Sequence, residues 1–234
     1  MAYATIFDRW HAAKRSERPP SAAAPATLAR YARVGRGVGT VLLVVGWVGV
    51  AAAALTAVLV SAGLAGLPVP LTSLGDDAAV TYGVSLGGLI VGIGPDMHGF
   101  RFLFHDAPSP TVGLALFALA QTVTAWLTVE AIGGARDLCA SIGAWAANPD
   151  GATPFRSGAQ AALSRIGRSL VAIPIVGAVT AMAMLPLVAA GESVAVSSDP
   201  AAPLMHLMAG ALALLLSRVF GYGASLQGEV DGLL

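Results

Sequence analysis

The sequence predicts an all-α membrane protein with four transmembrane helices and a small β-hairpin outside the membrane, between the first and second helices. The chain is 56% hydrophobic and 11% charged, with a mean hydropathy of +0.75, whereas soluble domains carry about 25% charged residues. Four windows without charge are long enough to cross a bilayer, which needs about 20 helical residues. A further uncharged window, residues 78–95, alternates with a period of two.

The uncharged windows set the expected spans. The first window lies between Arg36 and Asp76. Pro203 stands near the start of the last one, and the first turn of a helix tolerates proline because its N–H would have no partner there. One helix in each window gives a single transmembrane domain over residues 37–234. Its spans are expected at about residues 38–64, 109–132, 169–190 and 203–220, with an outer loop at 66–108 and a cytoplasmic loop at 134–168.

Residues 79–104 predict a small antiparallel sheet. Apolar residues alternate with small or polar ones along VTYGVSLG, a Gly-Gly pair supplies a two-residue turn, and LIVGI follows. The next stretch, GFRFLF, alternates as well. An open sheet edge cannot face lipid, so this sheet is expected in water or against the helix ends. A re-entrant or fifth helix is the alternative.

Basic residues are concentrated on one side of the expected bilayer. Of the 13 lysines and arginines, seven precede the first span, four lie between the second and third spans, and Arg218 closes the fourth. Only Arg101 falls in the two opposite loops, where six acidic residues lie. Because cytoplasmic loops carry the excess of lysine and arginine, both termini and the middle loop are expected in the cytoplasm.

Residues 1–36 are expected to form a basic cytoplasmic arm. Tyr3, Ile6, Phe7 and Trp10 recur at helical spacing, and most charges fall elsewhere on the helical wheel. This pattern suits a helix in the headgroup region, so Phe7 and Trp10 are candidate contacts to the membrane or to a partner. PPSAAAPAT then predicts an extended Pro/Ala linker. A disordered positive arm that only sets topology is the alternative.

The cytoplasmic loop predicts a short helix at the membrane surface. NPDGATP is dense in turn formers, and residues 155–168 then place apolar residues at helical spacing. We expect the helix to begin at the Pro-Phe pair and its arginines to hold its end at the headgroups. The candidate contacts to a partner or to the membrane surface are Phe155, Arg156, Arg165 and Arg168.

This loop and the last helix carry a family resemblance. Their matching residues are Pro154, Phe155, Ala161, Leu163, Arg165, Ile166 and Gly167, and then Val219, Phe220, Gly223 and Leu226. On these residues the chain resembles, over about residues 38–234, the bacterial integral membrane proteins of the domain of unknown function 2975 family. It departs from their pattern at Arg156, where Ser or Thr is usual, and near Gly158, where Asn is expected.

The resemblance implies a multi-pass protein of the bacterial inner membrane. Some members are encoded beside small helix-turn-helix regulators, which implies tethering or inhibition of a cytosolic transcription factor. The formal net charge of the chain is zero, so its charge does not favour direct binding to nucleic acid.

The sequence has no Walker loop, no H-E-x-x-H and no CxxC. Its one G-x-S-x-G string, GVSLG at residues 83–87, falls inside the predicted hairpin and not at a strand-to-helix turn, so it does not predict a catalytic serine. We therefore expect a protein that is not an enzyme and carries no cofactor. Its one cysteine, Cys139, excludes an internal disulfide.

Glu130 is the one carboxylate near a span interior, where we expect an interfacial ion pair with Arg136 or Arg168. Proton or substrate handling by Glu130 is the alternative.

Methionines and histidines gather toward the expected outer face. Their soft side chains suit copper or haem iron, but methionine is also an ordinary packing residue. We therefore expect packing and no metal site, and a haem or copper site is the lesser alternative. Its candidate ligands are His98, Met184, Met205, His206 and Met208.

Protein contact is the role that these observations favour. Regulation or tethering of a cytosolic partner is the leading hypothesis, and an accessory subunit of a larger membrane complex is the alternative. Transport by this chain alone is disfavoured, because the spans hold almost no charge and no internal repeat is visible. Small residues, such as Gly46, Gly49 and the alanines at 51–54, favour close helix packing. That packing is compatible with dimers or with a larger complex in the bilayer.

Overall fold

Four long helices make up most of the structure, a computed structural model. It describes residues 23–69, 71–74, 81–86, 89–104, 111–147, 158–191 and 194–231. Each helix is long and apolar enough to cross a membrane, which confirms the predicted number of such helices in the described part of the chain. They are α2 (Ala23–Leu64), α3 (Val112–Ala147), α4 (Ala159–Ala189) and α5 (Ala201–Asp231).

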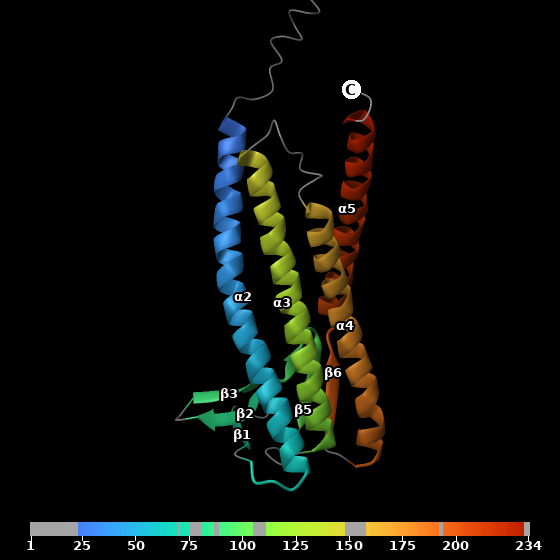
Figure 1. The fold of residues 1–234 in the computed structure, drawn as a ribbon. Coiled ribbons are helices and arrows are strands. Elements are labelled where there is room, and N and C mark those ends of the chain that lie inside the picture. Colours follow the sequence, from blue (N-terminus) through green and yellow to red (C-terminus); the bar gives the residue numbers. More distant parts are fainter. Residues whose placement is uncertain are drawn as a thin grey trace, which may run out of the picture.

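Each helix is longer than its predicted span, and the added turns lie at one end of the molecule. This end, called the terminal end below, holds the start of α2 and the end of α5 (Figure 1). α2 has 42 residues, about 63 Å at 1.5 Å per residue, roughly twice the hydrocarbon thickness of a bilayer. Hydropathy windows miss such turns because they measure transfer from water and not helix formation.

Two predicted local structures are corrected. Residues 23–27 are helical and not an extended linker, because alanine has the highest helix propensity and a first turn accepts proline. The short surface helix is not a separate element either, since α4 runs unbroken from Ala159 through Arg168 into the apolar segment. Gly158 precedes it in a left-handed conformation, with φ at 79°. The Pro-Phe pair lies outside the described residues.

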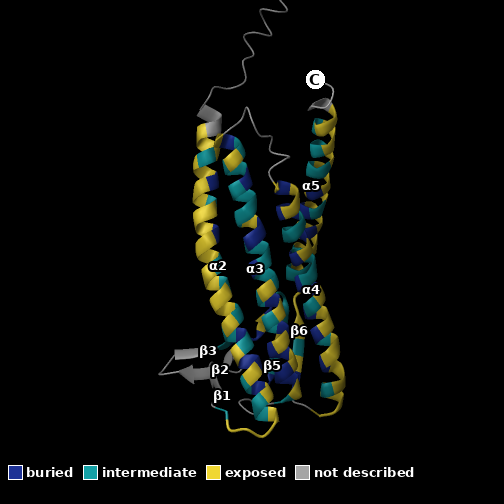
Figure 2. Ribbon diagram, viewed as in Figure 1, coloured by how far each residue is buried: buried dark blue, intermediate teal, exposed yellow. Residues whose placement is uncertain are grey.

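The helices form an open row. α2 packs on α3, α3 on α4 and α4 on α5, and no extensive contact joins α2 to α5 among the described residues. In the most apolar window of each edge helix, α2 or α5, only 17% of the residues are buried, against 44% in α3. In Figure 2, much of the α2 and α5 ribbons has the colour of exposed residues. Such long apolar faces suit a lipid environment, where they need no protein cover.

Two small antiparallel sheets lie at the opposite end of the molecule, called the sheet end below (Figure 1). In the first sheet Leu86 pairs with Leu89, so the predicted pairing of these two strands is present and two residues connect them. In the second, the phenylalanine-rich strand pairs with a strand that was not predicted, from between α4 and α5. The strands are β1 (Leu71–Leu74), β2 (Thr81–Leu86) and β3 (Leu89–Ile93), then β4 (Asp96–Met97), β5 (Phe100–Phe104) and β6 (Val194–Ser198).

The main hydrophobic core of the described residues lies at the sheet end, where α2, α3 and α4 meet the second sheet. Phe117 of α3 is fully buried, with its ring centroid 4.9 Å from that of Phe102 and 5.7 Å from that of Phe104. Gln121 Nε2 donates to the carbonyl oxygens of Gly94 at 3.3 Å and Asp96 at 3.0 Å. The strands therefore lie along α3 for about one turn, from Phe117 to Gln121, and do not merely cap the helix end.

Glycines set how closely neighbouring helices approach. A Cβ added to Gly167 of α4 would lie 2.9 Å from the Gly210 carbonyl oxygen of α5, and one on Gly210 would lie 3.0 Å from the Gly167 carbonyl oxygen. Gly46 of α2 similarly faces Val129 of α3, whose Cγ2 would lie 2.7 Å from an added Cβ. Gly49, by contrast, has nothing within 4 Å. Small residues thus allow close packing within the row, as they do in other membrane helices.

Replacing Gly167 with alanine tests this close approach. The new Cβ would meet the backbone carbonyl of Gly210, so α4 and α5 must separate. We expect a loss of about 1–3 kcal/mol of unfolding free energy, measured by denaturant unfolding of the purified protein in detergent. Gly49→Ala is the control, because its Cβ meets nothing within 4 Å and alanine is the better helix former. Equal stability of the two variants would show that the glycine contact is not required.

Candidate functional site

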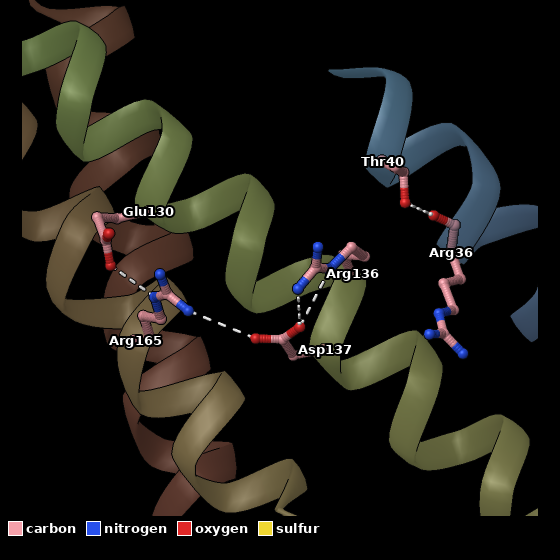
Figure 3. A network of polar contacts seen from close by, with 6 residues as sticks. All are labelled: Arg36, Thr40, Glu130, Arg136, Asp137 and Arg165. Atoms are coloured by element: carbon pink, nitrogen blue, oxygen red, sulfur yellow. Dashed lines mark hydrogen bonds and ion pairs between the residues drawn. The ribbon is translucent and has the colours of Figure 1, made fainter. Parts of the chain in front are cut away.

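Arg165 of α4 joins two carboxylates of α3. Its Nε donates to Glu130 Oε2 at 2.6 Å, and its Nη1 lies 3.4 Å from Asp137 Oδ2 (Figure 3). The two carboxylates are seven residues apart in sequence (137 − 130), about two turns along one face of the helix. One guanidinium can therefore reach both, and we call these three side chains the Arg165 clamp.

Two adjacent glycines make room for the clamp. A Cβ added to Gly133 would lie 3.4 Å from Arg165 Nη2, so the guanidinium lies against the backbone of α3. A Cβ on Gly134 would lie 2.7 Å from Ile166 Cγ1 and 3.0 Å from the Ala162 carbonyl oxygen. Glycine is thus needed for α4 to come this close, although glycine inside a helix costs about 1 kcal/mol in propensity.

The sequence predicted Arg136 or Arg168 as the partner of Glu130, but the structure pairs Glu130 with Arg165. Arg136 instead donates from Nη2 to Asp137 Oδ1 at 2.9 Å. The reason is geometric: residues six apart on a helix differ by about 240° in direction, whereas neighbours on one face are three or four apart. Arg168, the other predicted partner, donates from Nε to the carbonyl oxygen of Ser164 at 3.3 Å.

Sequence reasoning missed Arg165 as the partner of Glu130. The signal was present, because a Gly-Gly pair inside a helix stands between two carboxylates seven residues apart. Such a pair marks a close approach by another helix. It does not say which helix approaches, and Arg165 lies 35 residues along the chain from Glu130 (165 − 130). The clamp holds charges in fixed pairs, which suits a structural joint.

A second polar feature lies at the terminal end, between α2 and α3. A cleft of about 270 Å³ has Arg33 and Arg36 on one side, and small residues form most of its floor. Neither arginine makes an ion pair with a described residue. The remaining lining residues are Ala29, Ala32, Cys139, Ala140, Gly143, Ala144 and Ala147.

The structure does not bring the five candidate metal ligands, the histidines and methionines named above, together in one place. His98 and His206 come together, with their ring centroids 5.1 Å apart, and His206 Nδ1 is 2.8 Å from the Ala202 carbonyl oxygen. Met184 is fully buried in the core, whereas Met205 and Met208 are 71% and 59% exposed. Among the described residues, no three side chains of His, Cys, Asp or Glu are grouped to hold a metal ion.

Four predicted contact residues fall outside the part of the chain that the structure describes. They are Phe7, Trp10, Phe155 and Arg156. Their companions Arg165 and Arg168 are described, and they differ in environment. Arg165 is held in the clamp, whereas Arg168 is exposed and, among the described residues, bonds only to its own helix.

No protein-family model, curated protein or solved structure matches this chain. The resemblance drawn from the cytoplasmic loop and the last helix therefore stays a prediction.

Removing the arginine of the clamp should destabilise the fold. Arg165→Gln leaves a three-quarters buried carboxylate, Glu130, without its donor, and we expect a loss of about 1–3 kcal/mol in unfolding free energy. Glu130→Gln combined with Arg165→Gln should recover part of it, because the two effects are coupled. Unfolding in detergent measures all three variants. Arg168→Gln is the control, and its unfolding free energy should change by no more than about 0.5 kcal/mol. If Arg165→Gln changed the unfolding free energy no more than Arg168→Gln does, the clamp would not contribute to stability.

His98 should make stability depend on pH. It lies in the turn between β4 and β5, where burial and then the neighbouring His206 lower its pKa. The folded state therefore binds fewer protons than the unfolded state, so this contribution is present above about pH 6.5 and is lost as the pH falls below it. Thermal unfolding at about pH 7.5 and about pH 5.5 measures the loss. His98→Gln should reduce the difference; an unchanged difference would assign it to other groups.

Proposed function

We propose that this chain is a multi-pass inner-membrane protein, with both termini in the cytoplasm, that regulates or tethers a cytosolic protein by direct contact. The observation that carries the proposal is the cleft between α2 and α3. It lies on helix ends that continue past the apolar segments, and two arginines without a carboxylate partner among the described residues stand at its side.

The distribution of charge supports the orientation. Among the described residues, Arg101 is the one basic side chain at the sheet end, and it pairs with Asp96 at 2.8 Å. The other described arginines lie toward the terminal end, the side that the positive-inside rule assigns to the cytoplasm. They are Arg30, Arg33, Arg36, Arg136, Arg165, Arg168 and Arg218.

The lining of the cleft indicates the chemistry of the partner. Alanine and glycine on its floor leave space for an inserted side chain, and the arginines Arg33 and Arg36 attract negative charge. Complementary charge speeds encounter and fixes the orientation of a complex. An acidic segment of a cytosolic protein is therefore the expected contact. A transcription regulator is the partner that the family resemblance implies.

An accessory role in a larger membrane complex is the second candidate. It is favoured by the outward glycines of α2, Gly37 and Gly49, which have nothing within 4 Å of an added Cβ. They lie on an edge helix whose apolar face is otherwise exposed, and small residues are where membrane helices approach one another closely.

Photo-cross-linking in intact cells separates the two roles. A benzophenone amino acid at Ala144, which is exposed in the cleft, should capture a cytosolic protein. The same group at Val45, 63% exposed on α2, should capture only lipid. Arg33→Gln with Arg36→Gln should abolish the first product, while Arg218→Gln should leave it unchanged. An integral membrane protein captured at Val45, with no product at Ala144, would favour the accessory role.

Cysteine labelling tests the orientation. In a Cys139→Ala background, Ala195→Cys places an exposed thiol in β6, and Ala161→Cys places one near the terminal end of α4. A membrane-impermeant maleimide should label the first thiol in intact spheroplasts and the second only after permeabilisation. The reverse pattern would place the termini outside the cell.

A further inference from the structure

A groove opens between α3 and α4 beside the Arg165 clamp. It has a volume of about 300 Å³ and is lined on the α3 side by Trp126 and Leu127 and on the α4 side by Arg168, Ser169 and Ala172, with the Glu130–Arg165 pair at its wall. Arg168 is the last charge before the uncharged run at residues 169–189 of α4. The groove thus lies where the charged and apolar parts of the two helices meet.

Ser169 has an unsatisfied hydroxyl in this groove. The residue is only 5% exposed, yet no hydrogen bond joins its Oγ to any described residue. Other buried hydroxyls of the helices are satisfied: those of Thr56, Thr124 and Thr180 donate to the carbonyl four residues earlier, and Ser217 donates to the Gln160 carbonyl. A buried hydroxyl usually has a hydrogen-bond partner, so the Ser169 hydroxyl is available as a donor to a ligand in the groove.

Arg168 supplies positive charge at the same place. Its Nε is bonded to the Ser164 carbonyl oxygen at 3.3 Å, and its terminal nitrogens have no carboxylate partner among the described residues. The negative charge of Glu130 is matched by Arg165 at 2.6 Å, so Arg168 is the uncompensated charge of the lining. A guanidinium binds a phosphate group through two parallel hydrogen bonds.

The apolar part of the lining distinguishes a lipid from a free anion. Trp126 is 45% exposed, and tryptophan is enriched where membrane helices meet the headgroups. Leu127 and Ala172 give the groove an apolar side that a free phosphate ion would leave unused. The glycerol and first acyl carbons of a phospholipid would cover that side.

We propose that this groove binds the phosphate of a membrane phospholipid. The terminal nitrogens of Arg168 hold two phosphate oxygens, the Ser169 hydroxyl donates to a third, and Trp126 lies beside the headgroup. Basic pockets between transmembrane helices bind lipid headgroups in this way in other proteins. The proposal requires only that the helices cross a bilayer. It depends neither on a cytosolic partner nor on the orientation of the termini, so it can fail or hold independently of the proposed function.

Native mass spectrometry of the delipidated full-length protein provides the test. Phosphatidylglycerol, phosphatidylethanolamine, a diacylglycerol with the same chains and inorganic phosphate are each titrated. We expect one site that either phospholipid occupies and that the diacylglycerol and inorganic phosphate leave empty. Arg168→Gln should weaken phospholipid binding by about tenfold or more, as expected for the loss of charge-assisted hydrogen bonds, and Ser169→Ala by several-fold. Arg218→Gln, another exposed arginine toward the terminal end, should bind as the wild type does.

Three results would overturn the proposal. Diacylglycerol binding equal to that of the phospholipids would show that the phosphate is not recognised. Inorganic phosphate binding at the same site with equal strength would show that lipid is the wrong source. Wild-type affinity in both Arg168→Gln and Ser169→Ala would place any bound lipid elsewhere. If Arg168→Gln fails to fold, Ser169→Ala carries the comparison, since its hydroxyl makes no bond within the described protein.

Discussion

The contact between α3 and α4 is the constraint on which the rest of the structure depends. Gly133 and Gly134 let the two helices approach closely, and this approach puts Arg165 within reach of Glu130 and Asp137. A glycine pair inside a helix and a partly buried ion pair are each unfavourable alone. Together they are consistent, because the glycines remove the side chains that would keep the guanidinium away from its carboxylates. The groove beside the clamp and the outward direction of Arg168 follow from the same placement of α4.

The second sheet packs against α4 at the sheet end, beyond the start of α5. Phe100 of β5 fills the position that a Cβ on Gly177 would occupy, with its Cδ2 only 2.6 Å away, and Gly99 lies against Ala202 and Pro203 at the start of α5. α5 therefore begins beside the middle of α4, and β5 and β6 contact one side of α4 toward the sheet end. This arrangement also pairs the strands with one another and packs them against helices. It reduces the backbone edge that lipid could meet.

The sequence predicted the elements that have a local pattern, and it did not predict those fixed by contacts distant in the chain. Apolar length identified the four helices, the period of two identified β2 and β5, and the Gly-Gly turn identified β3. The prediction of one sheet over residues 79–104 was wrong, because β5 belongs to a second sheet with β4 and β6. β6 was missed because five residues after an apolar helix carry too little pattern to separate a strand from a loop, and only pairing with β5 defines it. The partner of Glu130 was missed for the same reason, since local rules concern residues three or four apart. The open row leaves no sequence signal at all, because hydropathy is the same for a side chain that faces lipid and one that faces another helix.

The pairing of β5 with β6 has a mechanical consequence. The four helices form two helical hairpins, α2–α3 and α4–α5. If the hairpins touched at a single level, one could rotate across the other about that contact. The Arg165 clamp fastens the hairpins at one level, and the strand pair fastens them again where Phe100 meets Gly177. On α4 these levels are twelve residues apart (177 − 165), about 18 Å. Two contacts at that separation resist rotation of one hairpin across the other, so the two hairpins are expected to move as one body.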